Sequence, residues 1–138
     1  MQLKKVKLIV TLLVFAVTVS LSGIKAFAYV SHDTSSVGGV NVYVGSTALM
    51  YYANATTTGS VPNSGIDASV TSTYRYVNMY TGEDGSDLKY SIGVNGVTVS
   101  FTSPDDCYSV NIESYHVAEY GGGRWIPITF QTYPNTIS

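Results

Sequence analysis

The side chains best suited to covalent or acid–base catalysis in this 138-residue chain are one cysteine, Cys107, and two histidines, His32 and His116. A nucleophile and its base must lie within hydrogen-bond reach of each other. Cys107 and His116 stand nine positions apart on one expected strand and have opposite parity, so they should face opposite sides of a sheet. We therefore expect no catalytic residues, with a hydrolase as the weaker interpretation. His116 is expected at the end of a core face, and Cys107 as a small semi-buried side chain or half of an intermolecular disulfide.

Carboxylates are the second group that could support chemistry. Five of the nine lie in two expected turns: Glu83, Asp84, Asp87, Asp105 and Asp106. Hard cations such as Ca²⁺ bind several oxygen ligands of this kind, and both turns should lie at the same end of the expected sheet. The spacing does not match an EF-hand loop, so we expect no cofactor and keep a Ca²⁺ site at these residues as the alternative. Glycoside hydrolysis by paired carboxylates is a further, weaker alternative.

Aromatic side chains are the third group, because the chain has 12 tyrosines and one tryptophan. Such rings supply rigid contact area for sugars and for protein partners. Strand alternation predicts that several of them are exposed, and the binding candidates are Tyr43, Tyr51, Tyr52, Tyr115 and Trp125. Tyrosine is also common in ordinary strands, so a purely structural role remains the alternative.

The N-terminus has the features of a secretory signal peptide of bacterial type. Three lysines precede an apolar run over residues 8–21, and Ala26-Phe27-Ala28 forms a small-x-small cleavage site. The apolar run is short for a membrane span. We therefore expect residues 1–28 to be removed and residues 29–138 to act outside the cell as one domain.

Charge and cysteine content narrow the choice of partners. Residues 29–138 contain three basic residues, Arg75, Lys89 and Arg124, against nine carboxylates, which gives a net charge of −6. Nucleic acids and anionic membranes are bound mainly through clustered lysine and arginine, so neither is expected as a partner. A single cysteine allows no internal disulfide, and the core must hold the fold unaided.

The composition favours strands over helices. Residues 29–138 contain 13 valines, 12 tyrosines and 13 threonines but only two leucines. Alternation and turn residues predict seven strands, with residues 56–65 expected to form a loop. The expected strands cover residues 40–44, 47–55, 68–80, 88–94, 97–102, 107–117 and 124–132. This pattern predicts an all-β fold, an antiparallel β-sandwich of the Ig-like or jelly-roll-like kind.

The strongest local signal is Asn95-Gly96 between two alternating runs, which predicts a β-hairpin with a type I′ turn. The predicted cross-strand pairs on its apolar face are Val94–Val97, Ile92–Val99 and Tyr90–Phe101. This face is expected to cover the core, because the opposite face is entirely polar.

Two later strands are also expected to bury alternate residues. The first should bury Tyr108, Val110 and Ile112, and the last should bury Ile126, Ile128 and Phe130. Pro127 lacks an amide donor, so the last strand should lie at a sheet edge or contain a bulge.

These observations favour a secreted, non-catalytic binding or interaction domain that acts outside the cell on a glycan, a cell-envelope polymer or a protein. A small antibacterial or toxin-like protein is one alternative, because the chain is short and exported. An extracellular matrix or self-assembling structural protein is another, because low charge and free sheet edges favour association. The oligomeric state does not follow from the sequence.

Overall fold

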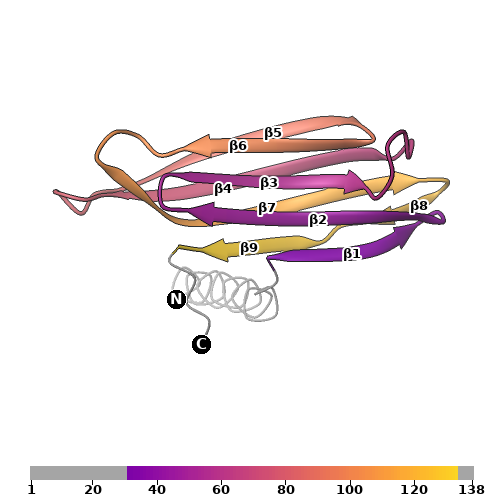
Figure 1. Cartoon of the computed structure of the whole chain (residues 1–138), viewed down its shortest axis with the longest axis horizontal. Helices are drawn as coiled ribbons and strands as arrows, with labels where there is room; N and C mark the ends of the chain where they lie inside the picture. Colours follow the sequence, from indigo (N-terminus) through magenta and orange to yellow (C-terminus); the bar gives the residue numbers. More distant parts are fainter. Residues whose placement is uncertain (1–30, 134–138) are drawn as a thin grey trace, which may run out of the picture.

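The computed structural model describes residues 31–133, which form two antiparallel β-sheets packed face to face (Figure 1). The expected β-sandwich is confirmed, whereas the predicted signal peptide at residues 1–28 lies outside the described residues. Within this part of the chain, no helix is long and apolar enough to cross a membrane. Its nine strands are β1 (His32–Val37), β2 (Val40–Leu49), β3 (Tyr52–Gly59), β4 (Asp67–Asn78), β5 (Asp84–Val94), β6 (Gly96–Thr102), β7 (Cys107–Tyr120), β8 (Gly123–Trp125) and β9 (Ile128–Thr132).

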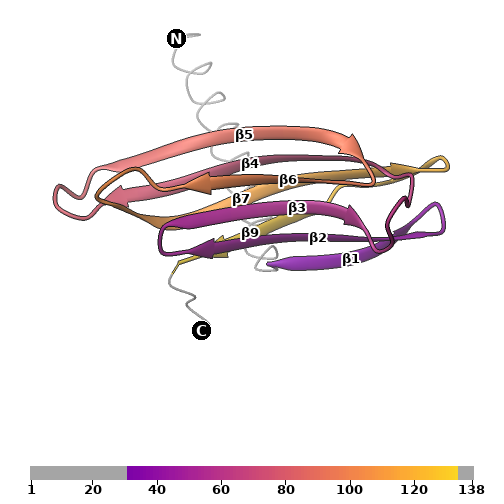
Figure 2. The same ribbon diagram turned by 45° about the horizontal axis from the view of Figure 1, so that its top comes forward.

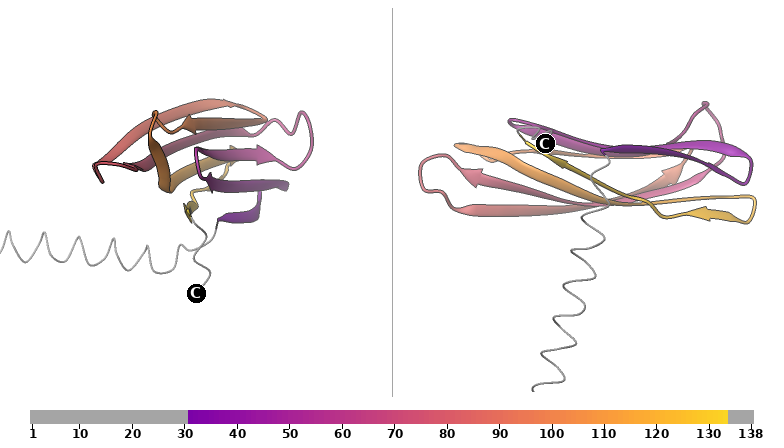
Figure 3. Two further views of the ribbon diagram at one scale, coloured as in Figure 1. Left: turned by 60° about the vertical axis from the view of Figure 1, so that its left-hand side comes forward. Right: turned by 90° about the horizontal axis from the view of Figure 1, so that it is seen from below.

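The two sheets contain strands from both halves of the chain. Sheet A has the order β1-β2-β3-β6, and sheet B has the order β5-β4-β7-β8, with β9 also paired to β7. The right-hand view of Figure 3 shows the indigo and violet strands of sheet A stacked on the pink and orange strands of sheet B. β5 and β1 lie at opposite margins of the molecule (Figure 2).

Several strands differ from the prediction; the expected strand over residues 47–55, for example, spans the end of β2, the turn at residues 50–51 and the start of β3. β1 was not expected, because its polar sequence lacks an alternating apolar face, yet it pairs along its whole length with β2. Residues 56–59 were predicted as loop from their composition, but they belong to β3. Within them, Thr57 points into the core and is fully buried. Threonine is a good strand residue when a neighbouring strand satisfies its backbone.

The predicted hairpin at Asn95-Gly96 does not form. β5 pairs with β4 in sheet B, whereas β6 pairs with β3 in sheet A, so the turn joins the two sheets. A type I′ turn needs a positive φ at both central residues, and only Asn95 has one, at 72°. The Asn95 amide instead donates to the Ile66 carbonyl at 2.8 Å, and its carbonyl accepts from the Gly59 amide at 3.0 Å.

The two strands of the failed hairpin behave differently toward the core. Val99 and Phe101 on β6 are buried, as expected. Ile92 on β5 was predicted to lie opposite Val99 in the core, but it pairs with Ser69 and is 69% exposed. The alternation was therefore identified correctly in both strands, and the side that faces the core was wrong for β5.

The burial patterns of β7 and β9 also correct the prediction. The pairing of β7 with β4 skips Val110, and this bulge reverses the parity, so Ser109 and Ile112 are both buried while Tyr108 and Val110 are only partly buried. In β9, Thr129 faces the core instead of its apolar neighbours. Pro127 lies in the break between β8 and β9. The strand that follows it, β9, is an edge strand, as predicted from the missing amide proton of Pro127.

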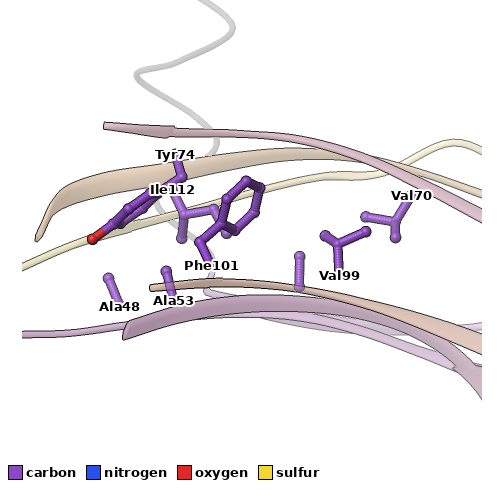
Figure 4. Close-up of a cluster of buried hydrophobic side chains, with 8 residues drawn as sticks. Ala48, Ala53, Val70, Tyr74, Val99, Phe101 and Ile112 are labelled. Atoms are coloured by element: carbon purple, nitrogen blue, oxygen red, sulfur yellow. The ribbon is translucent and has the colours of Figure 1, made fainter. Parts of the chain in front are cut away.

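The core is narrow and made mostly of small side chains. Its largest apolar cluster combines Tyr74, Val70 and Ile112 of sheet B with side chains of sheet A, namely Ala48, Ala53, Ala55, Val99 and Phe101 (Figure 4). Tyr74 and Phe101, its two largest side chains, pack with their rings tilted by 30° and the ring centroids 5.2 Å apart. A second cluster at the other end contains Val37, Val42, Ile66, Ala68 and Ala118.

A buried polar network also joins the two sheets. His116 on β7 is fully buried, with Nδ1 2.8 Å from the Thr57 hydroxyl and Nε2 2.7 Å from the Thr129 hydroxyl. Each ring nitrogen of His116 therefore has a threonine hydroxyl as its partner, and the Thr57 hydroxyl also donates to the Ser69 carbonyl at 3.1 Å. Beyond Thr129 the network continues through the hydroxyls of Ser46, Ser114 and Ser72.

Candidate interaction faces

The outer side of β5 carries a row of exposed apolar side chains. Its four members are 58–69% exposed: Leu88, Tyr90, Ile92 and Val94. Single exposed apolar residues are ordinary on a protein surface, but contiguous ones usually mark a place of interaction. We call these four residues the β5 strip.

Two glycines determine which side of β5 faces outward. Gly85 and Gly93 lie on the inward side, one near each end of the strand. A Cβ at Gly85 would lie 2.3 Å from the Tyr76 ring, and a Cβ at Gly93 would lie 3.0 Å from Val97 Cγ1. These neighbours crowd both ends of the inward side, which carries only Asp87, Lys89 and Ser91 between them, and the β5 strip takes the outer side.

Lys89, also on the inward side, closes the gap between the edge strands β5 and β6. Its Nζ donates to the Ser100 carbonyl and lies 5.1 Å from the centroid of the Phe101 ring. An inward-pointing charge of this kind discourages a sheet edge from pairing with another chain. The edge of β5 is therefore protected, whereas its outer face is not.

The β5 strip continues across the outer face of sheet B. In one row across the strands, Tyr90 pairs with Thr71, Thr71 pairs with Tyr115, and Tyr115 pairs with Ile128. Val117 and Phe130 share this outer side, in the rows above and below. We call the whole surface the sheet-B face; its apolar and aromatic members are Leu88, Tyr90, Ile92, Val94, Tyr115, Val117, Ile128 and Phe130.

Tyr115 gives the sheet-B face one defined polar contact. Its hydroxyl donates to Glu113 Oε1 at 2.7 Å, and this hydrogen bond raises the pKa of the Tyr115 phenol. The phenol therefore stays protonated and oriented along the face, and the aromatic ring is left 42% exposed.

The outer face of sheet A has the opposite chemistry. Thr56 and Thr98 hydrogen-bond across β3 and β6 at 2.8 Å, and the Tyr52 hydroxyl donates to Ser100 at 3.0 Å. Beside β1 and β2 this side has a shallow depression of about 470 Å³, lined mainly by hydroxyl and amide groups and by Tyr43. The outer face of sheet A is therefore mainly polar, whereas that of sheet B has apolar side chains on β5, β7 and β9 and a polar row on β4.

The predicted binding residues do not gather on one surface. Tyr43 and Tyr52 lie on the sheet A side, and Tyr51 lies in the turn between β2 and β3. Tyr115 lies on the sheet-B face, while Trp125 is partly buried against the second apolar cluster. The β5 strip was missed because alternation assigned it to the core, and Gly85 and Gly93 on the opposite parity were the signal that could have identified it.

The two acidic turns lie side by side, as the sequence predicted. The Met79 amide, next to the first turn, donates to the Asp106 carbonyl in the second at 2.8 Å. Asp84 and Asp87 both belong to β5 and have opposite parity, so they point to opposite sides of sheet B. Among residues 31–133, no three histidine, cysteine, aspartate or glutamate side chains are close enough to hold a metal ion.

Cys107 and His116 do not form a nucleophile–base pair. Both imidazole nitrogens of His116 are engaged by threonine hydroxyls, and burial lowers its pKa to about 4. Cys107 is a free thiol that is only 7% exposed, and because of the bulge at Val110 it lies on the same, core side of β7 as His116, so the expectation that the two face opposite sides was wrong. The expected position of His116 on the core face is confirmed.

Comparison with known proteins adds no assignment: no protein-family model, no curated protein and no solved structure matches this chain.

Proposed function

We propose that this protein is a secreted, non-catalytic interaction domain that binds a protein partner through the sheet-B face. The observation that supports this most is the β5 strip, whose apolar side chains are 58–69% exposed while serines, threonines and alanines fill much of the interior. Burying a large apolar side chain stabilises a complex by about 1.5–3 kcal/mol. The face thus offers a partner several such contributions.

The shape of the face favours a protein over a small molecule. Small-molecule sites are usually concave and enclose most of their ligand. The sheet-B face is an open strand surface, with Tyr90 and Ile92 on the edge strand β5, Tyr115 on β7, and the polar outer side of β4 between them. Protein interfaces combine apolar and aromatic side chains with polar ones in this way.

Site-specific photo-crosslinking tests this proposal, with two exposed tyrosines as a matched pair. A photoreactive phenylalanine replaces either Tyr90 on the sheet-B face or Tyr43 on the sheet A side, which are 58% and 40% exposed. The producing culture is irradiated, and the products are separated by mass. We expect a protein adduct from position 90 and none from position 43.

Two results would contradict the proposal. One is the absence of a protein adduct at position 90 in protein that circular dichroism shows to be folded. The other is equal crosslinking at both positions, which would mean that the sheet-B face has no preference over the rest of the surface.

Glycan binding is a second candidate, supported by the hydroxyl-lined depression beside Tyr43. Hydroxyl and amide groups around one aromatic ring suit a sugar, because the ring can stack while the polar groups hydrogen-bond. A glycan array probed with the protein and with its Tyr43→Ala variant tests this. Binding that Tyr43→Ala abolishes is the expected result, and binding that survives the change excludes the depression as the site.

A further inference from the structure

We infer, on the basis of the proposed function, that the partner of the sheet-B face is a second copy of this chain. The two copies pack face to face about a two-fold axis that runs in the interface, across the strands and through the row containing Tyr90 and Thr71. Each β5 then lies over the β5 of the other copy in the opposite direction.

Three of the four residues of the β5 strip are arranged symmetrically about this row, and the fourth, Val94, lies opposite Ser86 of the other copy. Leu88 and Ile92 stand two residues before and after Tyr90 on the same side of the strand. A two-fold interface requires that a surface be complementary to itself. Rotation about the Tyr90 row places Leu88 of each copy over Ile92 of the other, so an apolar side chain meets one of similar volume.

The charges on β4 are complementary under the same rotation. Asp67 and Arg75 are exposed on the outer side of β4, each four residues from Thr71, which pairs with Tyr90. Within residues 31–133 neither of them takes part in an ion pair. The rotation brings Arg75 of each copy over Asp67 of the other and forms two intermolecular ion pairs.

The dimensions of packed sheets allow these contacts. Four residues of strand span about 13 Å, so the two ion pairs flank the apolar centre at that distance on either side. Aligned sheets cross at about 30°, and at this distance from the axis the crossing displaces Arg75 of one copy from Asp67 of the other by roughly 7 Å. An arginine side chain can bridge such a gap.

The area of the sheet-B face suits a dimer of moderate stability. Large side chains expose on the order of 150–200 Å² when free, so the β5 strip and Tyr115 leave roughly 500 Å² of surface uncovered on each copy. Two such faces together bury about 1,000 Å², which is the lower limit of specific interfaces, and the polar rim adds to it. Pairing through the edge of β5 is the less favourable arrangement, because Lys89 points inward there.

Charge reversal combined with sedimentation velocity tests the arrangement. Arg75→Glu and Asp67→Arg each place like charges opposite one another at both ends of the face, so each variant alone should associate about tenfold more weakly or worse. Mixing the two single variants restores opposite charges at both contacts, and so does combining the changes in one chain. We expect both to recover association. Thr98→Lys, on the outer face of sheet A, is the matched control and should leave association unchanged.

The outcomes separate this inference from the proposed function. A monomer at all concentrations, with a folded circular dichroism spectrum, overturns the second copy as partner. If position 90 still crosslinks to a different protein, the proposed function stands. A dimer that Thr98→Lys weakens, or that neither charge reversal affects, places the contact on another surface and also overturns the inference. Loss of both dimer and adduct overturns both proposals.

Discussion

The fully buried His116 makes the stability of this protein depend on pH in a predictable direction. Burial lowers the pKa of its imidazole to about 4, against about 6.5 in an unfolded chain. Between these two values the unfolded state binds a proton that the folded state does not. The free energy of unfolding is therefore highest above pH 6.5 and falls as the pH decreases toward 4.

The size of this effect follows from the shift. One pKa unit corresponds to 1.36 kcal/mol, so a shift from 6.5 to about 4 removes about 3 kcal/mol between pH 6.5 and pH 4. Acidification affects stability through more than one group, so the wild-type curve alone does not isolate His116. A variant without the imidazole is needed as the reference.

Urea unfolding measured between pH 4 and pH 7.5, followed by Trp125 fluorescence, provides the comparison. His116→Gln should be less stable at pH 7, because it breaks a hydrogen bond inside the core, and its stability should fall by about 3 kcal/mol less on acidification. His32→Gln removes the exposed histidine of β1 and should follow the wild-type curve. Parallel curves for wild type and His116→Gln would refute the reasoning, since the imidazole would then titrate alike in both states.

Two further predictions concern the packing. Gly38 and Gly39 both have positive φ, at 56° and 86°, but only a Cβ at Gly38 would meet a backbone atom, the Tyr120 carbonyl oxygen at 2.2 Å. Gly39→Ala should therefore lower the free energy of unfolding by about 1–2 kcal/mol, because alanine is strained at this φ. Gly38→Ala should lower it by several kcal/mol, because it adds the clash with Tyr120. Equal losses for the two variants in thermal unfolding would contradict the predicted clash. Tyr74→Phe removes the buried hydroxyl that lies 2.7 Å from Ser109 Oγ and should cost about 1–2 kcal/mol. In Tyr74→Phe the Ser109 hydroxyl is left without its partner, so adding Ser109→Ala should recover part of the lost unfolding free energy. Fully additive losses in the double variant would show that the two hydroxyls do not depend on each other.

The fold class and most strands could be predicted from the sequence because they depend on local properties. Alternation, β-branched residues and turn residues act over a few positions, and they identified β2, β4, β6 and β7 despite errors at the ends. β1 was beyond this approach, because its strand conformation comes from pairing with β2 and not from its own residues. The bulge at Val110 was missed for a similar reason, since it is defined by the register of β7 against β4.

The Asn95-Gly96 turn shows the limit of a strong local signal. The same two residues can close a hairpin or connect two sheets, and the choice depends on which hydrogen bonds Asn95 makes. Its side-chain oxygen accepts from the Gly65 amide at 2.8 Å, and its backbone binds Ile66 and Gly59. These partners lie 29 or more positions earlier in the chain, so a window around the turn could not include them.

The candidate site was missed for a different physical reason. Alternation shows that a strand has an apolar side, but the surrounding space decides whether that side faces the core. For β5 the Tyr76 ring blocks a side chain at Gly85, and Val97 leaves little room for one at Gly93. Between these glycines the inward side of β5 carries Asp87, Lys89 and Ser91, so Ile92 and its apolar neighbours lie on the outer side. The apolar side of β5 that the fold leaves exposed is the physical basis for our proposal that the sheet-B face binds a partner.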